Sequence, residues 1–352
     1  METIGKEEMQ LLEERRTRRR RALFAELDNR FRQATAGQEP EVIHLRIAGV
    51  ALRIDCYFRE LAGPIRQQLA YCCRDRGEGG EIVLRIWGEP PAPYLSSPFW
   101  ARYRDGLCVA TEYVEPYWSR QRLIAHDREG RIGYLLNPLL SVMEVPSQGH
   151  LLFRSIYLAL LEDNRSLFHA AAVGWKGRGV LICGRGGRGK STLALSCLVS
   201  GFQYVSDDYL ILERNGGLFV HPIYSIVTLS REMQAKLPPL WGYYLHCNYN
   251  GTKDVLDISA RHCSFVQRLP IELGIFPEVR PGERPSVEPM HPGQAVVHAV
   301  HSTIRQTSLG ELPEQVCRLT GLLKDIPFYR FTVGEDLAEN VAVLQKFLEE
   351  KM

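Results

Sequence analysis

The sequence lacks several features that mark large classes of proteins. Its nine cysteines include no C-x-x-C pair and are odd in number, so we expect neither a zinc ribbon nor a disulfide framework. Free thiols in this number suit a reducing cytoplasm. No apolar run reaches about 18 residues, so no membrane-spanning helix is expected, and the charged stretch Met1–Arg21 does not resemble a secretory signal. We therefore expect a cytoplasmic protein without a membrane partner.

A strong excess of charge of either sign is also missing. The 43 basic and 41 acidic residues leave a formal net charge of +2, which argues against a protein built mainly to coat nucleic acid. Hydrophobic residues make up 45% of the chain and charged residues 24%, an ordinary globular balance. The length of 352 residues allows two domains or one large one.

Positive charge is nevertheless concentrated near the start. Residues 6–33 contain no glycine or proline and are rich in Glu, Arg and Leu, which predicts one helix. Six arginines lie within Arg15–Arg21. They form either a patch for nucleic acid, a membrane or an acidic peptide, or a solvated helix face on which Glu13 and Glu14 pair with nearby arginines. The narrow apolar stripe of the helix favours the solvated face.

The remainder of the first half reads as short strands with turns. Val42–Ile47 and Ala51–Phe58 flank a glycine break and predict a hairpin. Leu123–Ala125 and Ile132–Leu135 flank a polar turn and predict another. Residues 1–145 are therefore expected to form a smaller, mostly antiparallel α+β domain, whose role the sequence does not indicate.

The second half begins after a break rich in turn residues at Pro146–Gly149. A helix is expected over Leu151–Leu161, then strands over Leu167–Gly174 and Val180–Cys183. The expected fold class is α/β (α+β overall), with residues 146–352 as a catalytic domain preceded by the smaller one.

A phosphate-binding motif follows the second of these strands. Gly184–Ser191 reads G-R-G-G-R-G-K-S and fits the P-loop pattern G-x-x-x-x-G-K-[ST] in full. Its glycines allow successive N–H groups to curl around a phosphate at the N-terminus of a helix. Lys190 should reach the outer phosphates, and the Ser191 hydroxyl should ligate Mg²⁺. The expected ATP-binding residues are Gly184, Arg185, Gly186, Gly187, Arg188, Gly189, Lys190, Ser191 and Thr192.

Two adjacent acids come next along the chain. Asp207 and Asp208 end a predicted strand, Gln203–Ser206. A strand beside the P-loop strand would bring them to the edge of the sheet where ligands bind. One carboxylate can then hold Mg²⁺ while the other accepts a proton from an attacking hydroxyl. The alternative is a turn or helix cap, in which Asp is also common.

A single histidine, His169, interrupts the apolar strand that precedes the P-loop. On its own, a histidine in this setting is more often a buried core residue than a functional one.

Together, Phe168-His169-Ala170, the loop Gly184–Ser191 and Ser206-Asp207-Asp208 resemble the C-terminal catalytic domain of HPr kinase/phosphorylase in order and spacing. The resemblance is close over these motifs and loose over the rest of the second half. It implies a serine kinase that uses ATP and Mg²⁺. Asp207 would deprotonate the acceptor serine, Asp208 and Ser191 would be associated with the metal, and His169 would lie near the transferred phosphate.

The chain also departs from that family. Its first half does not resemble the family's N-terminal domain, and the segments that recognise and dephosphorylate HPr are not found after Asp208. Tyr209–Pro222 looks more like the divergent relatives of peptide biosynthesis clusters, some of which phosphorylate the C-terminal serine of a lasso precursor peptide. A serine-containing peptide or protein is therefore the expected acceptor. HPr, free serine, and a nucleotide-dependent binding module without phosphotransfer remain alternatives, and a homo-oligomer is open.

Several weaker candidates lie further along the chain. Lys253 could approach phosphate or face water, and Arg305 or Arg330 could neutralise a transferring phosphoryl group. The loop at residues 281–285 could contact substrate. Two histidines three residues apart, His298 and His301, could ligate zinc, but no H-E-x-x-H pattern accompanies them.

Overall fold

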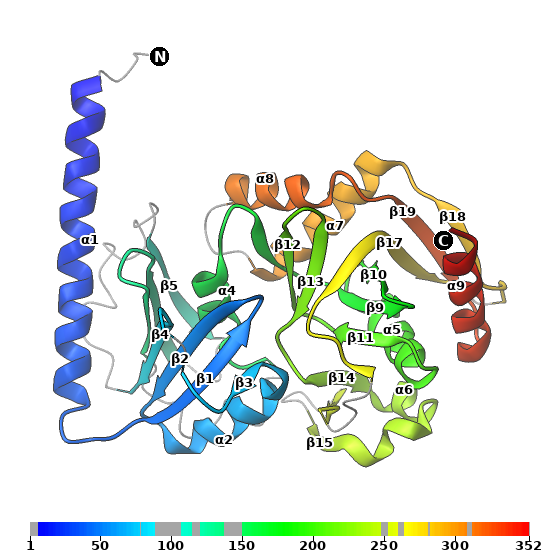
Figure 1. The fold of residues 1–352 in the computed structure, drawn as a ribbon, viewed down its shortest axis with the longest axis horizontal. Helices are drawn as coiled ribbons and strands as arrows, with labels where there is room; N and C mark the ends of the chain where they lie inside the picture. Colours follow the sequence, from blue (N-terminus) through cyan, green and yellow to red (C-terminus); the bar gives the residue numbers. More distant parts are fainter. Residues whose placement is uncertain are drawn as a thin grey trace.

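The computed structural model describes residues 6–77, 79–88, 107–114, 120–136, 150–247, 253–259, 264–280, 282–307 and 312–351. Figure 1 shows two neighbouring sheets with their helices. The helices are α1 (Lys6–Ala34), α2 (Arg59–Gln68), α4 (Phe153–Leu160), α5 (Lys190–Val199), α6 (Arg231–Ala235), α7 (Pro292–Thr307), α8 (Leu312–Leu323) and α9 (Leu337–Lys351), with 3₁₀ turns η1 (Ala70–Cys72) and η4 (Pro238–Tyr243). Among these described residues, no helix combines the length and the apolarity that a membrane crossing requires.

The first half forms a seven-stranded sheet in the order β3-β1-β2-β4-β7-β6-β5. Among its described strands only the β2–β4 and β4–β7 pairs are parallel, so the predicted mostly antiparallel α+β arrangement is confirmed. Both predicted hairpins, β1–β2 and β6–β7, are present. The strands are β1 (Glu41–Ile47), β2 (Val50–Cys56), β3 (Cys73–Arg74), β4 (Ile82–Trp87), β5 (Leu107–Val114), β6 (Arg120–Asp127) and β7 (Ile132–Leu136).

The second half forms a mixed sheet of nine strands, in the order β11-β9-β10-β17-β13-β12-β8, with β19 beside β17 and β18 beside β19. The β10–β17 and β17–β19 pairs are parallel. Its strands are β8 (Arg165–Phe168), β9 (Ala171–Trp175), β10 (Arg178–Ile182), β11 (Gln203–Ser206), β12 (Leu210–Arg214), β13 (Leu218–Pro222), β17 (Leu269–Val279), β18 (Ser286–Pro289) and β19 (Phe328–Val333). A small third sheet has the order β14-β16-β15, formed by β14 (Ile226–Ser230), β16 (Lys253–Asp257) and β15 (Tyr244–Cys247).

Helices cover both faces of the nine-stranded sheet. Along β10, Val180 and Ile182 pack into a core shared with α5 and α9, whereas Leu181 packs into a core shared with α7 and α8. This alternation follows from the period of two in a strand. A sheet with helices on both faces is the α/β arrangement expected from the sequence.

The strand predicted over Leu167–Gly174 is wrong in one respect. The chain forms two strands instead, because β8 ends at Phe168 and β9 begins at Ala171. β8 pairs with β12, whereas β9 pairs with β10 and β11. An apolar run interrupted by a single histidine carries no clear signal for the point where a chain leaves one strand partner for another. His169 lies at this crossing, where its backbone N–H donates to the Thr303 hydroxyl at 3.1 Å.

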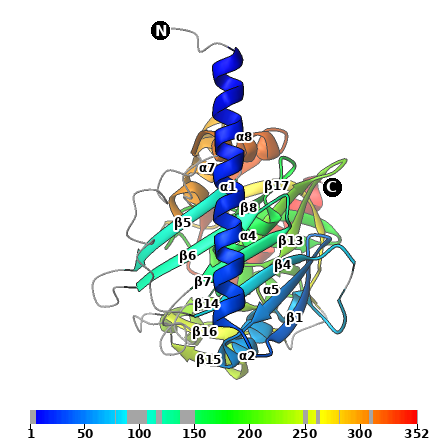
Figure 2. The ribbon, with the colours of Figure 1, turned by 90° about the vertical axis from the view of Figure 1, so that its left-hand side faces the viewer.

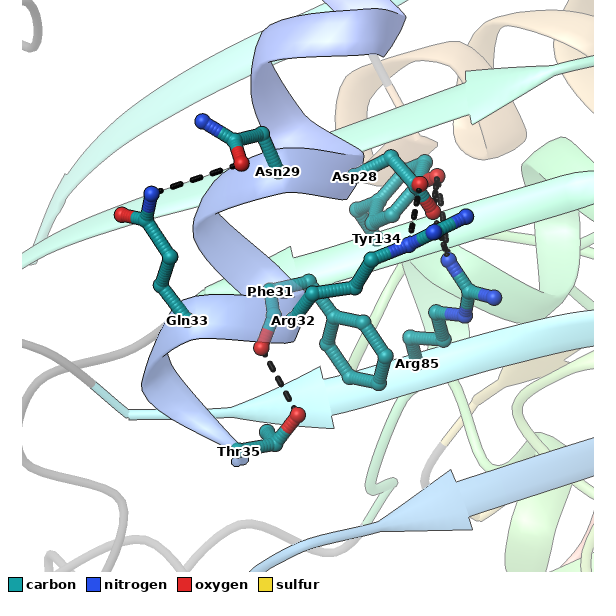
Figure 3. A network of polar contacts seen from close by, with 8 residues as sticks. All are labelled: Asp28, Asn29, Phe31, Arg32, Gln33, Thr35, Arg85 and Tyr134. Carbon is teal, nitrogen blue, oxygen red and sulfur yellow. Dashed lines mark hydrogen bonds and ion pairs between the residues drawn. The ribbon is translucent and has the colours of Figure 1, made fainter. Parts of the chain in front are cut away.

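The predicted N-terminal helix is confirmed as α1, which runs along the outer face of the seven-stranded sheet and extends beyond it (Figures 1 and 2). Phe31 meets Trp87 of the sheet edge-on, with ring centroids 5.4 Å apart. The guanidinium of Arg85 lies 4.5 Å from the Phe31 ring centroid and pairs with Asp28 (Figure 3). Aromatic packing and one part-buried ion pair therefore hold the C-terminal part of α1 on the sheet.

One hydrophobic core crosses from the first half to the second. Ile54 and Leu84 of the seven-stranded sheet share this core with Ile156 of α4 and with Tyr224, which precedes β14. Tyr71 adds a hydrogen bond from its hydroxyl to the carbonyl of Ile258, at 2.8 Å. The two sheets are therefore packed together through continuous apolar contact.

Candidate functional site

A cavity of about 810 Å³ opens beside the N-terminus of α5. That volume is within the range typical of small-molecule sites. The P-loop supplies Gly186, Gly187, Gly189, Lys190, Ser191 and Thr192 to its lining. Other elements contribute His150, His169, Asp208, Tyr209, Thr228 and Lys253 around the same space.

The P-loop has the backbone that phosphate binding requires. Gly187 and Gly189 have φ angles of 79° and 87°, in the left-handed region that favours glycine. Gly189 is also the N-cap of α5 and gives that helix no side-chain cap, so amides of the first turn are left for a ligand. Lys190 is buried, and its ammonium donates to the Arg185 carbonyl at 3.4 Å. Arg185 and Arg188 themselves are exposed.

The two acids reach the same sheet edge as the P-loop by a longer route than expected. β11, which ends at Ser206, is separated from β10 by β9. Since β9 is antiparallel to both, β10 and β11 run in the same direction, and their C-terminal ends meet at one edge. The expectation of a directly adjacent strand was therefore wrong, but the edge is the one expected.

Asp207 is buried next to the P-loop and does not line the cavity. Its side chain is 1% exposed, and neither carboxylate oxygen has a hydrogen-bond partner in the described part of the chain. Burial, followed by the charge of Asp208, raises the pKa of Asp207 to about 7, against the opposing effects of the nearby Ser191 hydroxyl and Lys190. A buried carboxylate without partners and with a pKa near neutral can take up a proton, whereas the Ser191 hydroxyl and the Asp208 carboxylate at the cavity offer the oxygen ligands that Mg²⁺ prefers.

A tight backbone turn separates the two carboxylates. Asp208 has a φ of 64°, and the N–H of Tyr209 donates to the carbonyl of Asp207 at 2.8 Å, closing a three-residue turn. Such a backbone is strained for a residue with a side chain and is often found at functional sites. As a result Asp207 is enclosed by the protein while Asp208 lines the cavity.

Asp208 is held by side chains from three other segments. Thr228 donates its hydroxyl to Oδ2 of Asp208 at 3.1 Å. The Nε2 atom of His169 lies 3.7 Å from Oδ1, and Nε2 of His150 lies 3.9 Å from Oδ2. Burial favours the neutral acid, but the two histidines and Lys253 outweigh it and hold the pKa of Asp208 well below its usual range.

Both histidines beside Asp208 favour the neutral form. Burial lowers the pKa of His150 to about 4, although Asp208 opposes the shift. Burial also lowers the pKa of His169. Near pH 7 this arrangement therefore places one ionised carboxylate between two neutral imidazoles.

Sequence reasoning missed His150. The residue follows a segment rich in turn residues and matches no motif, so no local signal marks it. In the folded chain its ring meets Tyr209 and Tyr224 edge-on, with centroids 4.9 and 4.8 Å away. Long-range packing alone brings it to the cavity.

The weaker candidate site residues differ in whether they line the cavity. Lys253 lines the cavity. Arg330 lies elsewhere and pairs with Glu278 and Glu288, at 3.3 and 3.5 Å. The side chain of Arg305 and residue 281 of the expected contact loop lie outside what the structure describes. Within the described ranges no group of three or more His, Cys, Asp or Glu side chains could hold a metal ion.

No protein-family model matches this sequence, and neither does any curated protein. Among solved structures, the chain matches the HPr(Ser) kinase/phosphatase from Coxiella burnetii, with 15% sequence identity and a TM-score of 0.30. The match covers 53% of this chain and 93% of that one. A match this weak carries no argument about function, so the function proposed below rests on the residues of the site.

Proposed function

We propose that this protein is an ATP- and Mg²⁺-dependent serine kinase, with Asp207 and Asp208 acting beside the P-loop. One observation carries the proposal. A complete P-loop and two differently placed carboxylates share one edge of the sheet, and the cavity there could hold both a nucleotide and an acceptor. The sequence resemblance to HPr kinase/phosphorylase agrees with this reading.

Each residue has a distinct part in the proposed transfer. The amides of the P-loop and Lys190 bind the phosphates and stabilise negative charge on the γ-phosphoryl group. Ser191 and Asp208 would hold Mg²⁺, which would neutralise negative charge on the phosphates. His169, and His150 with it, orient the Asp208 carboxylate.

Asp207 accepts the proton of the serine hydroxyl in this proposal. Its pKa of about 7 suits proton transfer near neutral pH. Both of its carboxylate oxygens lack hydrogen-bond partners in the described chain, so they are free to take up a proton. Because Asp207 lies behind the cavity lining, the acceptor hydroxyl must reach the Ser191 end of the cavity.

We further propose that the acceptor is a serine of a ribosomally made peptide, such as the C-terminal serine of a lasso precursor. The support is the sequence of Tyr209–Pro222, together with a first half unlike that of HPr kinases. Lys253 at the cavity would suit an acidic group on such a peptide.

The test is phosphate transfer followed by mass spectrometry of each acceptor. Purified protein is incubated with ATP, Mg²⁺ and, separately, serine-terminated peptides, HPr and free serine. Asp207→Asn should lower transfer by about 10²–10⁴-fold, and Asp163→Asn, a change at a fully exposed aspartate, should not. The absence of transfer to every acceptor, or transfer that ignores Asp207, would contradict the proposal.

The Asp208→Asn variant separates the two acids. We expect it to raise the Mg²⁺ concentration needed for half-maximal rate, with much of the rate restored at saturating Mg²⁺. If Asp208→Asn instead abolished transfer at saturating Mg²⁺ while Asp207→Asn preserved it, the two proposed roles would have to be exchanged.

A further inference from the structure

The cavity continues past the P-loop toward the start of α9. Its lining on this side comes from the ends of two strands and the first turns of that helix: Val279, Arg280, Val333, Gly334, Glu335, Leu337 and Asn340. No motif in the sequence marks these residues, and the phosphate chemistry described above does not use them.

Topology places this region beside the phosphate loop. β17 is parallel to the P-loop strand β10, and β19 is parallel to β17. The C-terminal ends of all three strands therefore lie at one edge, where α/β sheets bind their ligands. β10 leads into the phosphate loop, whereas β17 and β19 lead into this adjoining part of the cavity.

Val279 is an apolar side chain that lies beside the loop. It is 54% exposed, which is unusual for a residue that ends a buried strand. A Cβ added at Gly189 would lie 3.6 Å from its Cγ2 atom, so Val279 sits directly over the phosphate-binding backbone. Val333 and Leu337 add apolar surface on the same side of the cavity.

Phosphate itself is not suited to this side. The N-terminus of α9 is already capped, because Oδ1 of Asp336 accepts the N–H groups of Ala338 and Glu339 at 2.7 and 3.1 Å. A carboxylate at that position disfavours an anion. The N-terminus of α5, in contrast, has no side-chain cap.

The wall of this region is held in place. Asn340 is buried, and its side chain donates to the carbonyl of Gly334 at 3.0 Å while accepting the N–H of the same residue at 2.8 Å. This pair of bonds fixes the chain between β19 and α9. A ligand would therefore bind to a slot that is already formed, and little conformational entropy of the protein would be lost on binding.

From this geometry we infer that the slot formed by Val279, Val333 and Leu337 holds the nucleobase of the nucleoside triphosphate. The inference rests on the proposed function, since the same loop must hold the phosphates. A flat, largely apolar base suits an exposed valine, Val279, that adjoins the phosphate site, with the more buried Val333 and Leu337 completing the apolar surface. Exposed Glu335 at the rim could accept hydrogen bonds from the hydroxyl groups of the ribose.

The test compares ADP with inorganic pyrophosphate, which carries the phosphates without the nucleoside. Affinities of the full-length protein for both ligands are measured by isothermal titration calorimetry in the presence of Mg²⁺. We expect Val279→Ala to weaken ADP about tenfold, because it removes apolar contact with the base. Pyrophosphate should bind to this variant as it does to the wild type. Leu337→Ala should show the same selectivity.

A matched control is Val297→Ala, which removes the same groups from a 65% exposed valine on α7. It should change neither affinity. Equal weakening of ADP and pyrophosphate by Val279→Ala, or no weakening of either, would overturn the inference. Weaker acceptor-peptide binding with ADP unchanged would also overturn it and would assign the slot to the acceptor. A wild-type protein that binds neither ligand would refute the proposed function as well.

Discussion

Replacing Asp207 with asparagine should stabilise the protein at pH 8 even though it removes the proposed proton acceptor. The folded protein holds the proton of this buried acid up to a pKa of about 7, whereas the ordinary pKa is 3.8. Between these values the folded state binds more protons than the unfolded state, so stability falls as the pH rises. Above pH 7 the loss is complete and amounts to roughly 4 kcal/mol. Asparagine does not ionise, so the variant does not lose this stability.

The assay is urea unfolding of wild type and Asp207→Asn in EDTA, so that bound metal does not contribute. At pH 4 both side chains are neutral in the folded state, and the two free energies of unfolding should be similar. At pH 8 the variant should be more stable by roughly 4 kcal/mol. A variant that gains no stability over wild type between pH 4 and pH 8 would refute the account of Asp207 as a desolvated acid.

Asp208 provides an internal control, because its ionisation should stabilise the folded state, whereas that of Asp207 destabilises it. Its folded-state pKa lies below the ordinary value, so its charge contributes stability that is present above the unfolded pKa and is lost only as the pH falls through the folded one. Asp208→Asn should therefore destabilise the protein at pH 8. Because each acid perturbs its neighbour, the double variant should depart from the sum of the single ones.

Three further predictions concern the framework. Asp208→Gly should be more stable than Asp208→Ala by about 1 kcal/mol in urea unfolding, because a φ of 64° is unfavourable for a residue with a Cβ atom and costs glycine little. Equal stabilities of the two variants would count against backbone strain at this position. Gly179→Ala should cost at least about 1–3 kcal/mol by the same assay, since the new Cβ would lie 2.4 Å from the backbone oxygen of Pro270. Phe31→Ala should cost about 3–5 kcal/mol and should speed tryptic cleavage of α1, because the helix loses its contact with Trp87; cleavage at the wild-type rate would show that other contacts hold the helix.

The parts of the site that follow from sequence are those encoded locally. The eight residues Gly184–Ser191 indicate a strand–loop–helix unit by themselves, and the structure places them after β10 and into the first turn of α5. Asp207 and Asp208 were expected at the same sheet edge, but the intervening strand β9 could not be foreseen. Its position depends on strand pairing between residues far apart in the chain, which periodicity does not report.

The remaining features depend on tertiary structure alone. The left-handed backbone of Asp208 belongs to the turn that joins it to Tyr209. The sequence does not predict this conformation, because no glycine is present at that position. His150 reaches the cavity only because the two tyrosines beside it are packed in place. Val279 reads as the end of an ordinary buried strand until the parallel neighbour β10 brings it over Gly189.

One hydrophobic core runs through both halves of the molecule, so cutting the chain into fragments would expose part of that core. Ile156 and Tyr157 of α4 are buried among residues of the seven-stranded sheet, and α4 follows His150 by only a few positions. A fragment starting near residue 150 would turn these side chains toward water and would loosen the support of the histidine beside Asp208. The N-terminal half therefore supports the side chains that line the cavity around Asp208.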